Sequence, residues 1–185
     1  MLNCEDILSQ FVSPTSQLWP ILLTHSRCVA DLAVRIALAH PELSPDIDFV
    51  REAAMLHDVG VVQTDAPSIY CFGSLPYICH GIAGRQLLDS VNLPRHALVC
   101  ERHTGSGLTT DYIVANNLPL PQRDMTPQSV EEKIVCFADK FFSKSKNLTQ
   151  QKSFERALSS VAKYGDDSRQ RFLQLDQLLH IDTLQ

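Results

Sequence analysis

The sequence predicts an all-α fold, a bundle of about seven to nine helices around one core. Apolar residues recur at three- and four-residue spacings along most of the chain, which is the period of an amphipathic helix. No segment shows the alternating pattern of a strand over a useful length. With 185 residues, of which 44% are hydrophobic, the chain suits one domain with a sizeable core. We expect a single domain over residues 1–185, with a core at about 16–147 and a C-terminal helical extension at about 148–185.

The expected helices follow this apolar pattern from one end of the chain to the other. They are separated by stretches rich in proline, glycine and capping residues. The pattern predicts helices at residues 16–39, about 48–56, 77–92, 94–103, 109–117 and 129–144, and two amphipathic helices within 149–180.

Capping residues and helix breakers set the expected helix ends. Gly60 is expected to end the second helix, and Pro94 opens the helix at 94–103. Thr109 or Thr110 caps the short helix that follows. A break near Gly165 separates the two C-terminal helices.

Two stretches lack a helical period. Residues 118–128 are rich in proline and are expected to form a loop. Residues 61–76 look irregular, and loops of this kind often shape access to a site, although many merely connect helices.

Composition and charge narrow the class of protein. The net charge of −5 lacks the basic footprint of a nucleic-acid binder, so we expect no nucleic-acid polymer as a partner. A mildly acidic protein still binds phosphate groups where a metal ion supplies the positive charge. The six cysteines show no CxxC spacing and suit buried free thiols in a reducing compartment. No secretory signal or membrane span is visible, so a cytoplasmic protein without membrane contact is expected, and a homodimer is compatible with it.

Ligand-type side chains recur on the apolar stripes of five expected helices. An ionised aspartate on a core-facing stripe is costly unless it is paired or bound to a metal. Adjacent side chains diverge by about 100° on a regular helix, so His57 and Asp58 reach one metal only where the helix ends. Imidazole and carboxylate suit iron, manganese, nickel or zinc, although a histidine in a helix can instead make a core hydrogen bond. The set comprises His25, His57, Asp58, His80, His103 and Asp139.

Five motifs, in this order, resemble the HD-domain phosphohydrolase superfamily in its small, single-domain HDIG-type branch. They are LLTHSRCVADLA, MLHDVG, CHGIAGRQLL, CERHTGSGLT and EEKIVCFADKFFSKS, and together they span roughly residues 20–147. The His-Asp dipeptide alone is a weak signal, whereas its combination with an upstream histidine and a downstream Ala-Asp pair is specific. The resemblance implies an HD-domain helical bundle with a central metal site, and hydrolysis of phosphate esters or anhydrides.

The resemblance also implies roles for the individual ligands. Asp58 would bridge two metal ions and act in catalysis, as the aspartate of the dipeptide does in members with two metals. Those members include the HD-type symmetrical diadenosine tetraphosphate hydrolases and the cyclic-dinucleotide phosphodiesterases. One or two divalent ions are implied, of iron, manganese, nickel, zinc or magnesium. His25, His57, Asp58 and Asp139 match the four core ligands, and His80 and His103 match the two additional histidines.

The chain departs from the family pattern at one position of the dipeptide motif. Val61 stands where HDIG-type motifs often carry a lysine, so a positive side chain that could hold a phosphate is missing there. The GYP signature of cyclic-di-GMP enzymes and the regulatory domains of stringent-response alarmone enzymes are also absent. These features leave the specific substrate open.

The function expected from these observations is that of a metal-dependent phosphohydrolase. A metal-bound hydroxide would attack a phosphoester or phosphoanhydride of a small nucleotide-like substrate. Two alternatives stay open, a dinucleoside polyphosphate hydrolase and a non-catalytic sensor that binds metal and nucleotide. Five residues are further candidates for substrate binding, with surface solvation or an ordinary salt bridge as the alternative for each: Thr104, Arg102, Arg85, Lys140 and Lys144.

Overall fold

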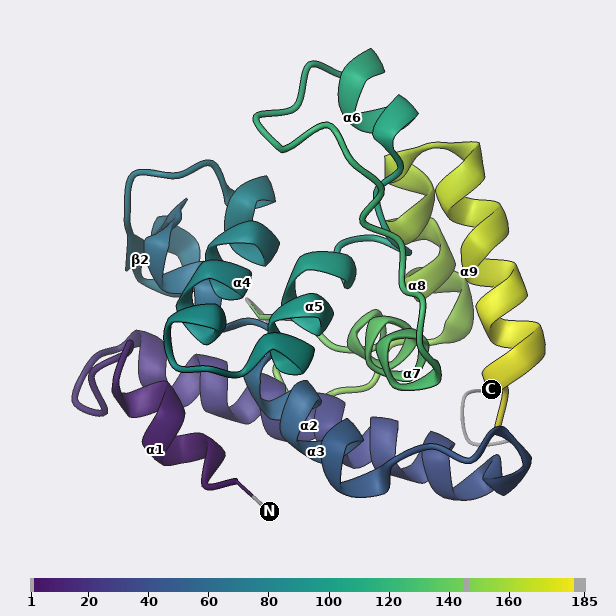
Figure 1. The fold of residues 1–185 in the computed structure, drawn as a ribbon, viewed down its shortest axis with the longest axis horizontal. Helices are drawn as coiled ribbons and strands as arrows, with labels where there is room; N and C mark the ends of the chain where they lie inside the picture. Colours follow the sequence, from purple (N-terminus) through teal and green to yellow (C-terminus); the bar gives the residue numbers. More distant parts are fainter. Residues whose placement is uncertain (1, 145–146, 182–185) are drawn as a thin grey trace.

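The computed structural model describes residues 2–144 and 147–181, so residues 182–185 of the expected extension lie outside this part. The described residues form nine α-helices, which confirms the all-α prediction (Figure 1). They are α1 (Cys4–Ser9), α2 (Leu18–Ala39), α3 (Ile47–Leu56), α4 (His80–Ser90), α5 (Pro94–Arg102), α6 (Thr110–Ala115), α7 (Val130–Asp139), α8 (Phe154–Val161) and α9 (Asp166–Leu179).

Short elements fill the connections, including the stretch at 61–76 that has no helical period. Two strands, β1 (Asp65–Ala66) and β2 (Cys71–Phe72), form a small antiparallel hairpin there. Each strand has only two residues, which is too short to leave an alternating pattern in the sequence. The 3₁₀ helices are η1 (Pro41–Leu43), η2 (Val59–Gln63), η3 (Pro67–Ile69), η4 (Tyr77–Cys79) and η5 (Ala162–Tyr164).

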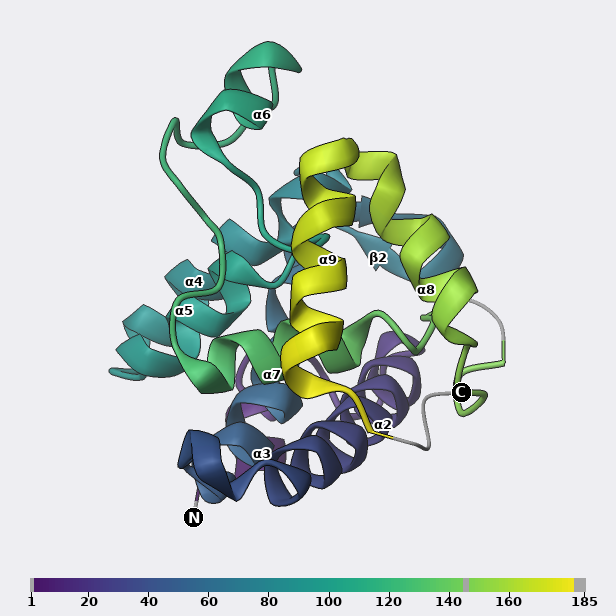
Figure 2. The same ribbon diagram turned by 90° about the vertical axis from the view of Figure 1, so that its right-hand side faces the viewer.

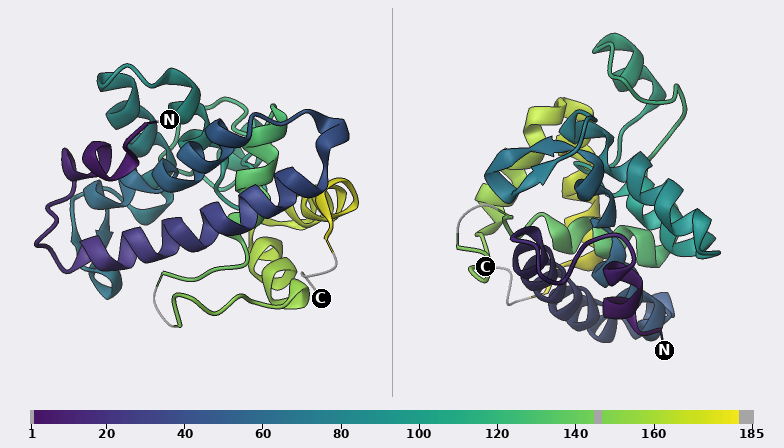
Figure 3. Two further views of the ribbon diagram at one scale, coloured as in Figure 1. Left: turned by 90° about the horizontal axis from the view of Figure 1, so that it is seen from below. Right: turned by 90° about the vertical axis from the view of Figure 1, so that its left-hand side faces the viewer.

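The helices pack around α7 at the centre of the molecule. The long helix α2 contacts α3 and α7, while α4 contacts α5 and η2 (Figure 1). The C-terminal helices α8 and α9 cover another side, with α9 lying against α7 (Figure 2). α2 crosses the width of the molecule, and α6 projects from the body on two extended connections (Figure 3). Within the described residues, no helix combines the length and apolar character needed to span a bilayer.

The C-terminal extension shares the main hydrophobic core. That core is formed by buried residues of α2, α3, α7, α8 and α9. Phe172 of α9 lies with its ring centroid 5.1 Å from that of Phe137 and 5.7 Å from that of Phe154. Phe137, Phe141 and Phe142 are all buried, as expected for core aromatics. The extension is therefore packed into the bundle, not appended to it.

Helix α7 ends five residues earlier than its apolar pattern predicts, at Asp139 instead of residue 144. Lys152 explains this early end. Its main-chain N–H donates to the carbonyl of Phe141 at 2.8 Å, and its ammonium donates to the carbonyls of Lys140 and Phe142 at 3.3 and 2.8 Å. These bonds satisfy the carbonyls of the three residues that follow the helix, which would otherwise need the hydrogen bonds of a longer helix. No local pattern reveals them, because they come from a residue twelve positions away from Lys140.

Gly60 serves close packing and does not end α3. That helix ends at Leu56, four residues before the glycine, and Gly60 lies within η2. A Cβ atom on Gly60 would lie 2.1 Å from the carbonyl oxygen of His80 and 2.2 Å from the main-chain nitrogen of Gly84. The glycine therefore allows η2 to touch the backbone of α4, which brings His80 toward the dipeptide.

Several expected helix boundaries are found in the structure. Thr109 caps α6, because its hydroxyl accepts a hydrogen bond from the N–H of Tyr112 at 3.2 Å. Gly165, with a φ of 92°, separates η5 from α9. Helix α1 was not expected from the apolar pattern, since it spans only six residues and begins at the side-chain cap of Asn3.

Candidate metal centre

Six ligand-type side chains from five helical segments meet in the interior of the bundle. All six are buried. Five of them sit at helix termini, where the chain changes direction and neighbouring side chains can converge. Asp58, just after the end of α3, has left helical geometry (φ −106°, ψ 6°), so it and His57 both face the centre. The positions are His25 within α2, His57 and Asp58 after α3, His80 at the start of α4, His103 after α5 and Asp139 at the end of α7.

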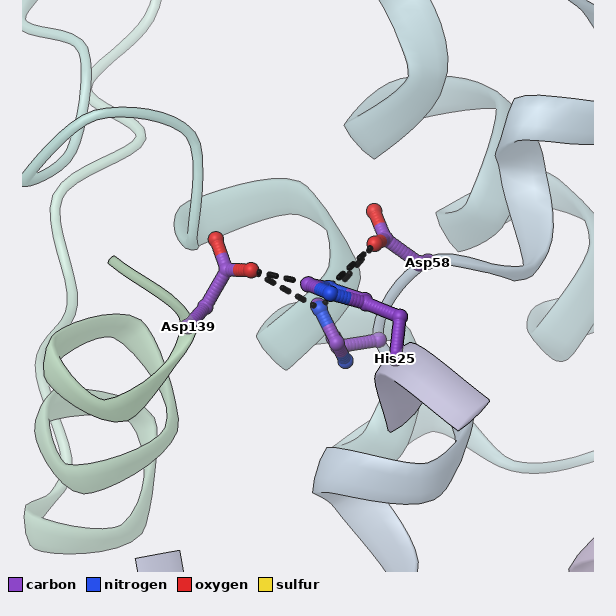
Figure 4. A group of neighbouring side chains, drawn as sticks. His25, Asp58 and Asp139 are labelled. Atoms are coloured by element: carbon purple, nitrogen blue, oxygen red, sulfur yellow. Dashed lines mark hydrogen bonds and ion pairs between the residues drawn. The ribbon is translucent and has the colours of Figure 1, made fainter. Parts of the chain in front are cut away.

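The first group joins His25, His57, Asp58 and Asp139. His25 Nε2 lies 3.0 Å from Asp139 Oδ1 and 3.1 Å from Asp58 Oδ2, and Figure 4 shows the imidazole between the two carboxylates. His57 Nε2 lies 3.2 Å from Asp58 Oδ2 and 3.5 Å from Asp139 Oδ1. One atom from each of these four residues falls within 4.8 Å of the others, which is the spacing of a shared cation site.

The second group shares Asp58 with the first. Its other carboxylate oxygen, Oδ1, lies 3.4 Å from His103 Nε2 and 3.6 Å from His80 Nε2. The two imidazole nitrogens are 3.0 Å apart. Asp58 therefore presents one oxygen to each group, which is the arrangement of a carboxylate that bridges two adjacent ions.

Three of the histidines are oriented by the same local device. His57, His80 and His103 each direct Nδ1 to the main-chain carbonyl three residues earlier, at 2.7 to 2.8 Å. A carbonyl only accepts, so Nδ1 carries the hydrogen and, in the neutral ring, Nε2 is left as a bare acceptor. This is the outer-shell arrangement that fixes metal-binding histidines in proteins.

The donor set fits a divalent cation. With Nδ1–H committed to carbonyls, the facing Nε2 atoms of His80 and His103 and Oδ1 of Asp58 are all acceptors, and no hydrogen lies among them. Asp58 Oδ1 is buried without a hydrogen-bond partner. Such an orphaned acceptor is costly in a protein interior. Imidazole nitrogen and carboxylate oxygen are ligands of manganese, iron, nickel and zinc.

The charges of the cluster shift the pKa values of its members strongly. Burial would raise the pKa of Asp58, but Lys144 and His57 hold it well below its usual range. Lys140 does the same for the pKa of Asp139. Burial would lower the pKa of His57, yet the two carboxylates raise it to about 9. Burial and the nearby His103 lower the pKa of His80 to about 3, which keeps its Nε2 lone pair free.

Two lysines reach the carboxylates of the cluster. Lys144 Nζ lies 2.7 Å from Asp58 Oδ2, and Lys140 Nζ lies 2.6 Å from Asp139 Oδ2. Lys140 also donates to the carbonyl of His103 at 2.9 Å. Of the five substrate-binding candidates from the sequence, these two are the ones that contact the ligand carboxylates.

The two arginines among those candidates are used elsewhere in the fold. Arg102 pairs with both oxygens of Glu132 on α7, at 2.9 and 3.0 Å. Arg85 pairs with Glu101, a buried carboxylate that also accepts hydrogen bonds from Arg123. Both arginines form the ordinary salt bridges that were the alternative for them, and a substrate contact of either one stays a prediction.

The turn after His103 is held by α9. Thr104 is buried directly after the ligand, and its carbonyl accepts from the N–H of Gly107 at 2.9 Å. Ser106 donates to the carbonyl of Ser168 at 2.7 Å, and Arg171 donates to the carbonyl of Gly107 at 2.9 Å. The C-terminal extension thus fixes the segment that carries His103. A substrate contact of Thr104 remains a prediction.

Sequence patterns missed two further residues at the site. Tyr77 stacks on His80, with ring centroids 4.8 Å apart and an interplanar angle of 23°. Lys152, in the segment before α8, donates to the carbonyls of Lys140 and Phe142 just after α7. Tyr77 begins the helix expected at 77–92 but precedes the CHGIAGRQLL motif, and Lys152 lies outside the motifs, so neither residue was marked by a motif.

An all-helical bundle that buries two adjoining His/Asp groups is compatible with the binding of divalent metal ions. A family model described as HD domain matches residues 22–143, a range that includes all six ligand-type residues. The chain belongs to the HD-domain family, within the superfamily of metal-dependent phosphohydrolases. No solved structure matches the chain significantly.

The chain is similar to three curated proteins over most of its length. It is 35% identical over 133 residues to a tRNA (cytidine(56)-2'-O)-methyltransferase of Picrophilus torridus, covering 70% of this chain and 34% of that protein. It is 29% identical over 179 residues to a protein of the same name from Thermoplasma volcanium, covering 96% and 46%. An uncharacterized protein of Methanocaldococcus jannaschii is 31% identical over 143 residues, covering 74% and 77%. The chain thus spans less than half the length of either methyltransferase.

These relatives overturn one expectation drawn from charge. The acidic composition predicted no nucleic-acid polymer as a partner, but two relatives are named for a tRNA substrate. Net charge failed as a guide because it averages over the whole surface and does not include bound metal ions.

Proposed function

We propose that the chain is a metal-dependent phosphohydrolase that cleaves a phosphate ester or anhydride of a nucleotide-type compound. The observation that supports this most is the position of Asp58, whose two oxygens face two adjoining groups of ligands. Two divalent ions held side by side lower the pKa of bound water and offset the charge on phosphate oxygens. Membership of the HD-domain family supports the same reaction class.

The residues of the chain have distinct tasks in this proposal. Asp58 would contribute a ligand to each of the two ion sites, so it is the residue assigned to catalysis. His57 and Asp58 orient each other at the end of α3, and the carbonyl of Ala54 holds the His57 ring in place. Lys140 and Lys144 lie beside the carboxylates and can turn an N–H donor to a phosphate oxygen, since an ammonium carries three donors.

Lys144 supplies the positive charge that Val61 lacks. Val61 is fully buried in the hydrophobic cluster around η2, so its side chain packs in the core instead of entering the site. The ammonium of Lys144 lies 2.7 Å from Asp58 Oδ2. The loss of a lysine at position 61 is therefore compensated by a cation from the segment after α7, which favours a catalytic site over a degenerate one.

A non-catalytic binding module is the second candidate, and Val61 is the feature that favours it. The names of two relatives add RNA to the substrates that need testing, although the chain matches only 34% and 46% of those proteins. Methyl transfer by the whole relatives is therefore not extended to this chain.

Turnover distinguishes the two candidates. The purified protein is loaded with manganese, iron, nickel, zinc or magnesium and assayed on an aryl phosphodiester. It is then assayed on free nucleotides, dinucleoside polyphosphates and short RNAs with terminal phosphates. Turnover that is abolished in Asp58→Ala, while the variant still melts as a folded protein, supports the enzyme. Saturable nucleotide binding without product from any metal or substrate supports the binding module.

A further inference from the structure

A cavity of about 180 Å³ opens beside the metal cluster. It adjoins a second hollow of about 450 Å³, and the two share Phe142, Lys144 and Lys152. Asp139 lines the smaller cavity, so anything bound there lies next to the first group of ligands. The remaining polar lining of the smaller cavity includes Lys140, Ser160 and Tyr164.

Lys152 differs from the other two lysines of this cavity in its partners. Lys140 and Lys144 each contact a carboxylate of the cluster. The ammonium of Lys152 donates to two main-chain carbonyls, of Lys140 and Phe142, and among the described contacts it pairs with no carboxylate. Two of its three N–H donors are thus used, and its charge has no direct counter-ion in the described part of the chain.

The surroundings of Lys152 are unfavourable for a cation. Burial and the neighbouring Lys140, Lys144 and Lys163 lower its pKa, against the attraction of Asp139. A half-buried ammonium among like charges weakens the fold, and an anion in the cavity would remove that repulsion.

We propose that Lys152 makes this cavity an anion subsite, which binds a second phosphate group of the substrate beside the phosphate held at the metal cluster. The inference rests on the proposed function and narrows its substrate class to compounds with two or more linked phosphates, such as nucleoside polyphosphates. Lys152 lies outside the residues matched by the HD-domain model, which end at 143. The C-terminal extension therefore contributes Lys152, Ser160 and Tyr164 to the lining of the subsite.

Pyrophosphate binding to the metal-free protein tests the subsite without any need for turnover. Calorimetric titration at fixed ionic strength is carried out on the wild type, on Lys152→Gln and on Lys152→Arg. We expect Lys152→Gln to weaken binding by about tenfold or more, because a hydrogen bond to a charged group is worth about 1.5–3 kcal/mol. Lys152→Arg keeps the charge and should bind within a few-fold of the wild type. Lys133→Gln removes a lysine of α7 that lines neither cavity, and it should have no effect. Equal binding by Lys152→Gln and the wild type overturns the proposal.

A matched pair of serines covers the case in which Lys152→Gln does not fold. Ser160 lines the cavity, and its hydroxyl donates to the carbonyl of Ala157, whereas its neighbour Ser159 is exposed. Ser160→Asp places a carboxylate in the cavity and should abolish pyrophosphate binding, while Ser159→Asp should leave it unchanged. Equal binding by the two aspartate variants contradicts the subsite.

Kinetics separates failure of the subsite from failure of the proposed function. For an active enzyme, Lys152→Gln should raise KM for a nucleoside diphosphate more than for a monophosphate ester. A purely structural role would change both substrates alike, and that result overturns the proposal. If no phosphate compound is turned over, the proposed phosphohydrolase function is contradicted. The subsite is then still tested by pyrophosphate binding, which is measured independently.

Discussion

The ammonium nitrogen of Lys144 lies 2.7 Å from Oδ2 of Asp58, the carboxylate that both ligand groups share. Lys144 is mostly buried, and the neighbouring Asp58 raises its pKa well above the usual range against the effect of burial. The lysine therefore provides positive charge where a divalent ion would also be held. A bound ion and this ammonium compete for the same oxygen.

Lys144→Met should consequently bind metal more tightly and turn over substrate more slowly. Removing a competing cation should raise the affinity for manganese or zinc, by about tenfold if the lost repulsion is near 1.4 kcal/mol. Turnover should fall because the charge that faces the phosphate is gone. Calorimetric metal titration and phosphate release, on the same preparation, check both directions. Weaker metal binding would contradict the competition.

The two ligand groups predict the number of bound ions. Protein purified without chelator should carry up to two transition-metal ions per chain by elemental analysis. His103→Gln should reduce this to about one, because the second group loses a ligand while the first stays intact. His40→Gln serves as a control, since His40 contacts Glu42 at the surface. A wild-type stoichiometry of one, unchanged in His103→Gln, would refute a site for two ions.

The sequence predicted which ligand-type side chains meet in the interior better than it predicted their surroundings, for a physical reason. Histidine or aspartate on an apolar helical stripe is visible locally, and all six such positions meet in the structure. The end of α7 was misplaced because Lys152, a distant residue, satisfies the carbonyls of the residues that follow the helix. Arg102 looked available because its partner Glu132 lies 30 residues away, and no local pattern reveals such a pair.

The raised pKa of His57 predicts how the stability of the metal-free protein varies with pH. Its folded-state pKa is about 9, above the ordinary value of about 6.5. The folded state therefore holds this proton more tightly, and the stabilisation is complete below pH 6.5 and lost as pH rises through 9. We expect the free energy of unfolding to fall over this window by a few kcal/mol. Urea unfolding of the wild type and His57→Gln isolates this effect, because cysteine titration is common to both. Parallel pH profiles would show that His57 is not protonated in the fold.

Gly60→Ala should disrupt both stability and metal binding. The new methyl group would meet the His80 carbonyl and the backbone of Gly84, and neither can move without shifting α4. We expect a loss of about 3 kcal/mol or more, together with weaker binding of the second ion, whose ligand His80 begins that helix. Gly165→Ala is the control, because its positive φ makes the change costly while no ligand lies on η5 or at the start of α9. Thermal unfolding and metal titration of both variants should show a shared loss of stability but a loss of metal only in Gly60→Ala.

Arg102→Gln tests the assignment of this arginine to the fold. Glu132 is buried and accepts two hydrogen bonds from Arg102, so removing the guanidinium leaves a carboxylate with one fewer cation. Because Arg102 itself is partly exposed, the expected loss lies between that of a surface pair and a buried pair, about 1–3 kcal/mol. KM should stay within about twofold of the wild type, since a changed substrate contact worth 1.4 kcal/mol would give about tenfold. Chemical unfolding and steady-state kinetics measure the two effects separately. A large rise in KM at unchanged stability would return Arg102 to the substrate-binding set, and it would place the entrance of the site on the α5 side of the cluster.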